Sequence, residues 1–448
     1  MPASRSTNRQ AKPPLDFRLG TFFLWLLVLA VPFVLAPVAK ESFREPKLLA
    51  GEWLALASLT CFAWGLRRVE SVRLAEVWRL PALRLAVPCL LVATAGLASS
   101  HHPLQVRDAL VDLWIGAAAL VGWSVALPAV RSERLLRGLL WPASLLALVG
   151  ILQYFGFQPL ALASSQRGGR LAITSLAGNP GDLAAYLVLP CLVAQLSLGR
   201  RLRAGEGWAS PRVWGTALAL AVSFYAMLLT QTLAAVAAVL AGTLLLWAPR
   251  VPRRRAAALL AGLLVAFALL AAGVAPLRQR VMEKAQALAE GNWNWLVTGR
   301  LDGWRTAVWM LREHPLTGVG QGAYRAEFAP AKLALLTQGV KFFPGLQEAG
   351  FANAHNELLE AGAEWGIPGL LALAWALWVL LAALIRDGRP GRAPEDRALA
   401  WAGTAALGIL SLVDFPFRIA LVAFPALLFL SWVLRPEEHE EHGEEVTG

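Results

Sequence analysis

The sequence carries little charge for its length. Of its 448 residues, 16% are charged and 57% are hydrophobic, whereas a soluble domain has about 25% charged residues. A typical soluble domain is therefore excluded. Apolar runs near the roughly 20 residues that a membrane-spanning helix needs recur along the chain, and they lack the alternation of a barrel strand. We predict an all-α polytopic membrane protein.

Cysteine is also scarce. The three cysteines, Cys61, Cys89 and Cys191, all lie in apolar runs. No CxxC or Cys/His spacing occurs, so neither a disulfide framework nor a zinc site is supported. The sequence also lacks H-E-x-x-H, G-K-[ST] and paired-carboxylate motifs, so a metalloprotease or an ATPase is not expected.

The apolar runs predict twelve membrane spans. The spans are residues 20–39, 48–66, 82–98, 109–130, 136–156, 182–199, 212–230, 232–249, 255–276, 366–386, 398–414 and 419–434. The predicted parts are an N-terminal tail (1–19), spans one to nine (20–276), a polar segment (277–365), spans ten to twelve (366–434) and an acidic tail (435–448). Pro37 occupies the place of a small residue in a signal-peptidase site, so an uncleaved first span is expected.

Arginine is concentrated in every second interval between these spans. Arg250, Arg253, Arg254 and Arg255, for example, follow span eight. Because loops rich in Lys and Arg stay in the cytoplasm, both termini are predicted to be cytoplasmic. The polar segment 277–365 then lies outside, in the periplasm or its equivalent. The same bias accounts for the net charge of +11, so no nucleic-acid partner is expected.

The polar segment holds the densest polar sequence in the chain. Apolar residues at helical spacing predict helices over 277–289 and 301–313. A third helix is expected over 353–365, running into span ten and broken near Gly366 and Pro368. The intervening T-G-V-G-Q-G follows a helix and has no βαβ surroundings, so it predicts a turn rather than a dinucleotide-binding loop.

Arg300 is the first candidate site residue. It lies at or just before the start of a predicted helix, where backbone N–H groups add positive potential. A guanidinium in that position is suited to phosphate oxygens. The other interpretations are an ion pair with Asp302 or Glu313, or contact with lipid headgroups.

His355 is the second candidate. A histidine at the membrane surface accepts a proton near neutral pH, and Glu357 or one of Asn353 and Asn356 is expected to orient it. The alternative is an interfacial histidine bonded to backbone. Four acidic residues near span ends are further candidates, because ionisable groups in lipid are functional by default: Glu52, Asp112, Asp182 and Asp414.

Several short motifs together carry a family resemblance. They are G-R-x-x-x-W from Gly299, H-P-L-T-G-V-G-Q-G from His314, A-H-N-E-L-L-E from Ala354, E-W-G-I-P-G-L-L from Glu364, S-L-A-G-N-P-G-D-L from Ser175 and V-D-F-P-F-R from Val413. In these motifs, and in twelve spans with one large outer loop, the chain resembles the O-antigen ligase and polymerase superfamily.

The resemblance implies a glycosyltransferase of the bacterial inner membrane. Such an enzyme moves a glycan from undecaprenyl diphosphate to an acceptor hydroxyl, with lipid A–core as the expected acceptor, at the periplasmic face. It implies no metal and no other cofactor, because arginine neutralises the departing diphosphate. Arg300 matches the family arginine after Thr-Gly, and His355 matches the histidine that activates the acceptor. Asn353, Asn356 and Glu357 would support that histidine.

The sequence departs from the family pattern at one position. Ser-Arg-Gly normally opens a span after the seventh, whereas this chain has Thr232 and Leu233 there. Leucine cannot bind phosphate. Arg170, Arg305 and Arg325 are the candidates to replace the missing arginine at the diphosphate.

Four alternatives stay open from the sequence. An O-antigen polymerase and a protein O-oligosaccharyltransferase share the donor chemistry and differ in the acceptor. A twelve-span transporter belongs to another class, and it would place polar groups near mid-membrane rather than in one outer segment. An inactive scaffold of the same fold is the fourth.

Overall fold

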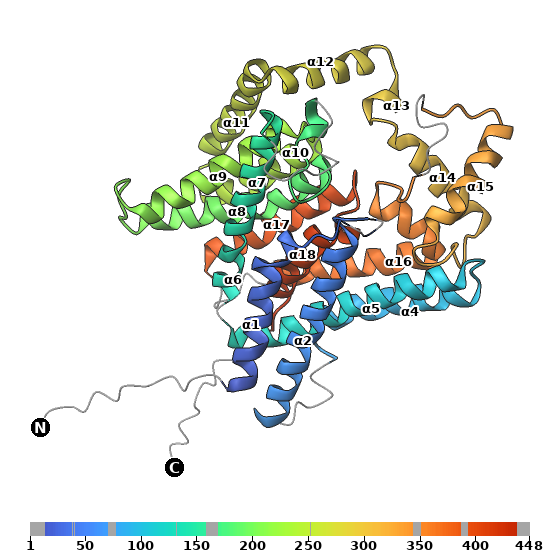
Figure 1. Ribbon diagram of the computed structural model, residues 1–448, viewed down its shortest axis with the longest axis horizontal. Helices are drawn as coiled ribbons and strands as arrows, with labels where there is room; N and C mark the ends of the chain where they lie inside the picture. The colour runs from blue at the N-terminus through green and yellow to red at the C-terminus, as the bar shows by residue number, and fades with distance from the viewer. Residues whose placement is uncertain are drawn as a thin grey trace, which may run out of the picture.

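The computed structural model describes most of the chain, as helices joined by turns (Figure 1). The described residues are 14–37, 39, 41–69, 78–130, 132–157, 169–250, 252–343, 351–386 and 393–436. No β-strand occurs among them, which confirms the all-α class. Most of the two predicted tails lies outside the described residues. The helices are α1 (Leu15–Leu29), α2 (Glu45–Val69), α4 (Pro81–Ala95), α5 (Pro103–Ala126), α6 (Ser132–Gly138), α7 (Leu140–Tyr154), α8 (Pro180–Arg203), α9 (Pro211–Leu229), α10 (Leu233–Trp247), α11 (Arg253–Gly273), α12 (Ala275–Ala289), α13 (Trp293–Leu296), α14 (Arg300–Glu313), α15 (Tyr324–Thr337), α16 (Glu357–Arg386), α17 (Pro394–Ser411) and α18 (Ala420–Val433), with short 3-10 turns that include η5 (Gly169–Ala172) and η7 (Pro416–Arg418).

Within the described part of the chain, nine helical stretches are long and apolar enough to cross a bilayer. They correspond to predicted spans one to eight and ten. Predicted spans nine, eleven and twelve are helices too, namely α11, α17 and α18, but they are not among the nine. Helix α17 opens with charged residues and α18 has only 14 residues. A multi-pass membrane protein is supported, and the count of twelve stays a prediction.

The fourth span begins earlier than predicted. Helix α5 starts at Pro103 rather than at residue 109, and Pro103 occupies the first helical position, where its missing N–H costs nothing. The first two turns of α5 contain the polar residues Gln105, Arg107 and Asp108. These residues suggested a loop, but they form the polar end of the helix.

Helix α8 is the most buried of the nine spans. It is apolar on nearly every side from Leu183 to Ala194, and it packs against α7, α9, α10 and α17. Asn179 caps its start, with its Oδ1 accepting a hydrogen bond from the Gly181 N–H at 2.7 Å. Charged residues are confined to its two ends, Asp182 in the first turn and three arginines in the last. At about 1.5 Å per residue, those ends lie about 35 Å apart.

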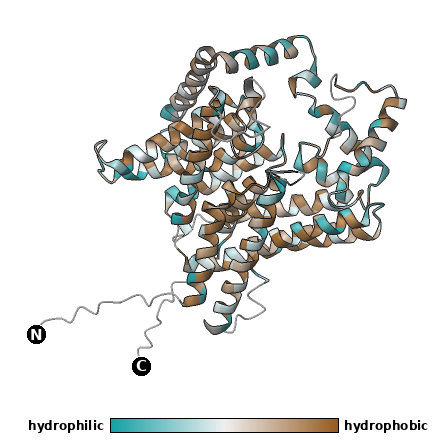
Figure 2. Ribbon diagram, viewed as in Figure 1, coloured by the Kyte–Doolittle hydropathy of each residue, from teal (hydrophilic) through white to brown (hydrophobic). Residues whose placement is uncertain are grey.

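The polar segment forms a group of helices outside the bundle. In Figure 1, α12 and α13 arch over one end of the molecule, and α14 and α15 lie beside α16. Hydrophilic residues are more frequent along these outer helices than along α8 or α18 (Figure 2). A second hydrophobic cluster, including Val106, Met310 and Tyr324, fastens α14 and α15 to α4, α5 and α16. The helices predicted over 277–289 and 301–313 are confirmed as α12 and α14, whereas α15 was not predicted.

The predicted turn T-G-V-G-Q-G forms backbone hydrogen bonds with α16 next to its predicted break. Gly366 has φ of +67° and interrupts the helix. Beside it, the Val319 N–H donates to the Ala363 carbonyl and the Gly320 N–H donates to the Glu364 carbonyl, each at 2.9 Å. We call residues 315–322 with residues 363–367 the glycine clamp. It joins two of the family-like motifs through their backbones and fixes the first turns of α16.

Candidate active site

Arg300 is the first residue of α14. The two residues before it, Thr298 and Gly299, have φ of 60° and 80°, so the chain turns sharply into the helix. Arg300 forms neither of the ion pairs that the sequence left open, with Asp302 or with Glu313. Asp302 instead accepts hydrogen bonds from Asn294 at 2.8 Å and from the Phe343 N–H at 2.5 Å.

The guanidinium of Arg300 has no hydrogen-bonded anion among the residues that the structure describes. Its Nε is buried without a hydrogen-bond partner there. Burial lowers the pKa of Arg300, while Asp414 opposes that shift and Arg280 adds to it. Arginine keeps its charge in proteins, so Arg300 is a half-buried cation without a bonded anion among the described residues.

His355 lies in the turn that precedes α16. Its φ of +56° is left-handed, which costs a non-glycine residue about 1 to 3 kcal/mol. Its Nδ1 lies 3.4 Å from Oδ1 of Asp414, and its ring stands between Phe351 and Phe415, with ring centroids 5.7 Å and 4.8 Å away. The carboxylate and the two aromatic rings position the imidazole, and Nε2 lies on the other side of the ring from Asp414.

The structure brings Arg300 and His355 together around one carboxylate. Trp304, one turn after Arg300, places its indole Nε1 at 3.5 Å from the His355 carbonyl oxygen. Asp414 pairs with His355 and also interacts electrostatically with Arg300. The two residues predicted to carry the chemistry therefore lie at the same end of the bundle.

The three residues predicted to support His355 hold its turn rather than its ring. Asn353 donates to the carboxylate of Glu360 at 2.7 Å. Asn356 and Glu357 bond the backbone of the loop after α17, at 2.9 Å and 3.2 Å. Within the described chain, none of the three has a hydrogen bond to the imidazole, whose neighbour is a carboxylate of that loop.

Arg418 joins the same loop to α16 through buried charges. Its Nη1 lies 3.2 Å from Glu360, its Nη2 lies 2.6 Å from Glu364, and its Nε lies 3.9 Å from Glu357. Burial alone would lower the pKa of Arg418, but the three carboxylates outweigh burial and raise it. Moving the loop away from α16 would separate these ion pairs and leave buried charges uncompensated, which is costly. Arg418 therefore holds the loop that carries Asp414 against α16.

Arg44 belongs to this cluster, although the sequence argument did not single it out. Its Nε and Nη2 bond both carboxylate oxygens of Asp182, at 2.8 Å and 2.9 Å. Its guanidinium carbon lies 5.5 Å from the ring centroid of Phe415, which also faces His355. Burial lowers the pKa of Arg44, and the pairing with Asp182 more than reverses that effect. A usable signal was present, since Arg44 is an arginine in an interval predicted to face outward.

Two of the three arginines predicted to replace the missing family arginine are exposed and have protein partners. Arg305 donates to the Lys341 carbonyl at 3.0 Å, and Arg325 lies 3.9 Å from Glu41. The side chain of Arg170 lies outside those that the structure describes. A role for any of them at the diphosphate stays a prediction.

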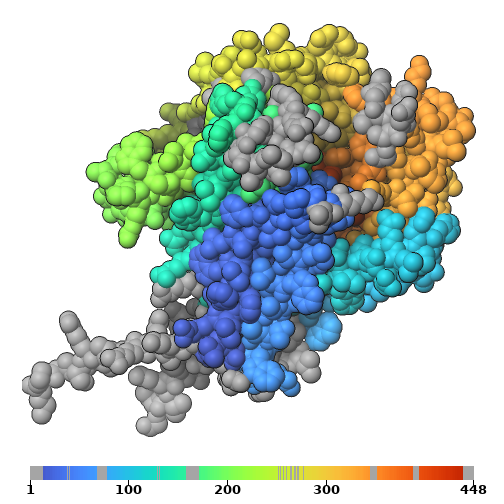
Figure 3. All heavy atoms as spheres, viewed as in Figure 1, coloured from blue at the N-terminus to red at the C-terminus, as the bar shows by residue number. Residues whose placement is uncertain are grey.

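The segments that supply the cluster border a recess in the surface. Figure 3 shows this recess between the blue N-terminal helices, the yellow arch of α11 and α12 and the orange outer helices, with red C-terminal residues at its floor. Arg44, His355 and Asp414 come from the blue, orange and red segments respectively.

The fold and this cluster define a multi-pass helical membrane protein in which a half-buried arginine, without an ion pair to any described residue, lies beside a histidine–aspartate pair. Residues 218–374 match the family model described as O-Antigen ligase. This match over part of the chain supports the O-antigen ligase superfamily, and the resemblance predicted from the motifs is confirmed. The family points to an enzyme that transfers glycans. The match includes Arg300 and His355 but not Arg44 or Asp414. No curated protein matches the chain.

Proposed function

We propose that this protein transfers a glycan from undecaprenyl diphosphate to an acceptor hydroxyl, with lipid A–core as the acceptor. The observation that carries the proposal is the meeting of the His355–Asp414 pair with Arg300, a half-buried cation whose Nε is buried without a bonded anion among the described residues. A base and a phosphate-binding cation are the two groups that such a transfer needs.

In the proposed reaction, the acceptor oxygen attacks the anomeric carbon of the donor. As this bond forms, the hydroxyl proton passes to Nε2 of His355, and the bond between the anomeric carbon and the diphosphate oxygen breaks. Asp414 faces Nδ1 and stabilises the imidazolium that results. The 3.4 Å separation between Nδ1 and Asp414 is long for a hydrogen bond, and catalytic pairs commonly tighten once substrate is bound.

Arg300 acts on the leaving group. When the bond breaks, its electron pair stays on the lipid diphosphate, which gains one negative charge. A guanidinium already removed from water stabilises that charge more strongly than a solvated one would. The same charge is absent from the intact glycosidic oxygen, so the interaction favours the transition state over the bound donor.

The face of the membrane is assigned by charge. Asp182 and the cluster lie at one end of α8, and three arginines lie in the last turn at its other end. Because arginine-rich ends face the cytoplasm, the cluster is assigned to the periplasmic side. Polymerases and protein O-oligosaccharyltransferases share this donor chemistry, and lipid A–core is preferred here on the family resemblance.

The test is transfer in cells that lack their own ligase and express variants of this protein. Arg300→Gln and His355→Gln are each expected to abolish the ladder of glycan on lipid A–core, while undecaprenyl diphosphate–glycan accumulates. Immunoblots of membranes check that each variant is inserted at the wild-type level.

Matched controls lie close by in the chain. Arg312→Gln removes the same charge from the exposed last turn of α14, and His314→Gln removes a histidine at its end; both are expected to leave the ladder intact. Full ladders in Arg300→Gln and His355→Gln would refute the proposal. Growth of the glycan chain without attachment to lipid A–core would instead identify a polymerase.

A further inference from the structure

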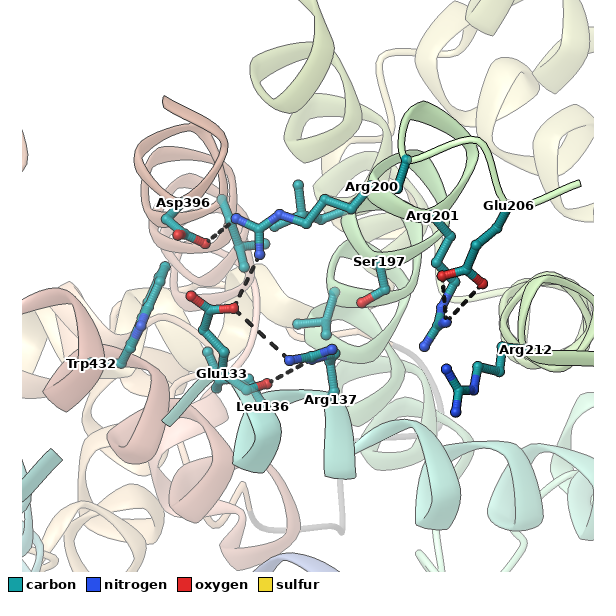
Figure 4. Close-up of a pocket in the computed structure, with 14 residues that line it drawn as sticks. Glu133, Leu136, Arg137, Ser197, Arg200, Arg201, Glu206, Arg212, Asp396 and Trp432 are labelled. Carbon is teal, nitrogen blue, oxygen red and sulfur yellow. Dashed lines mark hydrogen bonds and ion pairs between the residues drawn. The ribbon is translucent and has the colours of Figure 1, made fainter. Parts of the chain in front are cut away.

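A cavity of about 370 Å³ lies at the other end of α8 from the candidate active site (Figure 4). Residues of α6, α8, α9, α17 and α18 line it. Its volume falls within the range of about 300 to 1,000 Å³ for small-molecule sites. Glycan transfer as proposed above makes no use of this cavity.

Three arginine side chains converge on the cavity. Arg137, Arg201 and Arg212 all line it; Figure 4 shows the ends of Arg201 and Arg212 near each other and Arg137 turned toward Glu133. Arg201 bonds Glu206 at 3.1 Å. Arg137 donates from Nε to the Glu133 carbonyl at 3.2 Å, and its Nη2 lies 4.0 Å from the Glu133 carboxylate. Arg212 forms no ion pair with any residue that the structure describes. The cavity therefore offers guanidinium groups that the protein itself does not saturate.

A fourth arginine of the lining, Arg200, is in a different situation. It lies 2.7 Å from Asp396, 2.9 Å from Glu395 and 3.2 Å from Glu133. These carboxylates engage the whole guanidinium and tie α8 to α17. Arg200 thus forms part of the wall, and the other three arginines face the space.

The cavity lies beside the ends of apolar spans, where the headgroups of a surrounding bilayer are expected. Its arginines stand in the first or last turns of apolar spans, which is where charged side chains meet the bilayer surface. Two exposed tryptophans beside Arg212, Trp208 and Trp214, pack edge to face with centroids 6.1 Å apart. Tryptophan is enriched at that same interface.

Apolar side chains line part of the cavity and one exposed face of the neighbouring helix α7. Leu136, Val193 and Leu196 form part of its lining. On α7, Trp141 and Leu145 are exposed, and their spacing of four places them on one face of the helix. A ligand with a phosphate head and a hydrocarbon chain would meet cations at one end and apolar side chains at the other.

We propose that this cavity binds the headgroup of an anionic phospholipid. The phosphodiester would contact Arg137, Arg201 and Arg212, and the acyl chains would follow the apolar face of α7. Basic pockets between membrane helices on the cytoplasmic side are suited to such headgroups. Free phosphate shares the head chemistry but would gain nothing from the apolar surface.

The test is titration of phosphatidylglycerol into the purified full-length protein in neutral detergent, with bound lipid counted by native mass spectrometry. Saturable binding is expected for phosphatidylglycerol and not for phosphatidylcholine. The double variant Arg137→Gln/Arg212→Gln should bind about 30-fold more weakly, because each basic side chain contributes roughly fivefold to an anionic lipid contact. Arg212→Gln alone should lose about fivefold without disturbing an ion pair of the described protein.

The matched control is Arg254→Gln/Arg255→Gln, which removes the same charge from exposed arginines of the same membrane face. It should bind phosphatidylglycerol like the wild type, and all variants should keep the wild-type melting temperature. Equal weakening in the control would show a diffuse charge effect and overturn the proposal. Displacement of the lipid by inorganic phosphate at equal concentration would also overturn it, in favour of a soluble anion.

Discussion

Replacing Gly318 with alanine tests whether the glycine clamp holds the start of α16. Gly318 has φ of +62°, and a Cβ there would lie 2.2 Å from the carbonyl carbon of Glu364, a backbone atom that cannot rotate aside. The left-handed conformation costs alanine about 1 kcal/mol. Moving the turn away also breaks the bonds from Val319 and Gly320 to α16, each worth about 1 kcal/mol. The expected local destabilisation is roughly 3 kcal/mol.

Hydrogen–deuterium exchange of the purified protein measures this loss where it occurs. Since 1.4 kcal/mol is a factor of ten, amides in peptides covering the clamp should exchange about 100-fold faster in Gly318→Ala. Gly339→Ala is the matched control, because Gly339 has φ of +81° but open space around a Cβ, so only the conformational term applies. Its clamp amides should exchange at the wild-type rate. Equal exchange in the two variants would refute the clamp.

Two further predictions concern the loop after α17. Asp414→Asn keeps the shape of the side chain but removes the charge beside Nδ1 of His355, so glycan transfer should fall about 100-fold or more with donor binding unchanged; wild-type transfer would exclude Asp414 from the mechanism. Arg418→Gln leaves the carboxylates around it without their cation, so the free energy of unfolding should fall by about 3 to 5 kcal/mol, seen as a lower melting temperature in detergent. The melting temperature of Arg418→Lys should lie between those of the wild type and Arg418→Gln. An unchanged melting temperature in Arg418→Gln would contradict the proposed role of this ion-pair network.

Much of the fold follows from composition and from a few backbone-breaking residues. Long Leu and Ala runs predicted the spans, and Gly366 with Pro368 predicted the break in α16. The start of α5 was placed too late, because polar residues in its first turns resemble a loop when only hydrophobicity is considered. The clamp itself was not foreseen, because it depends on backbone contacts between segments far apart in sequence.

The site was predictable where a single residue carries its own chemistry. Arg300 and His355 stood out as a phosphate-binding cation and a base in a polar segment. Asp182 and Asp414 were recognised only as isolated acidic groups near span ends. Their pairing with Arg44 and His355 depends on tertiary packing, and no periodicity in the sequence reports it. The expected helpers Asn353 and Asn356 prove to shape the turn around the histidine.

Leu233 stands where the family pattern has an arginine, so the proposed site has one cation fewer to neutralise a lipid diphosphate. A lipid diphosphate brings several negative charges, and the family pattern would meet them with a second arginine where Leu233 opens α10. Arg44 is near, but Asp182 holds it with two hydrogen bonds, and releasing it would leave a buried carboxylate unpaired at a cost of several kcal/mol. Arg44 therefore stays with Asp182 and adds little net charge. Of the described arginines beside His355, Arg300 is the one without a bonded anion. In the proposed reaction, neutralisation of the leaving group therefore depends on Arg300 more strongly than it would in a site with two free guanidiniums.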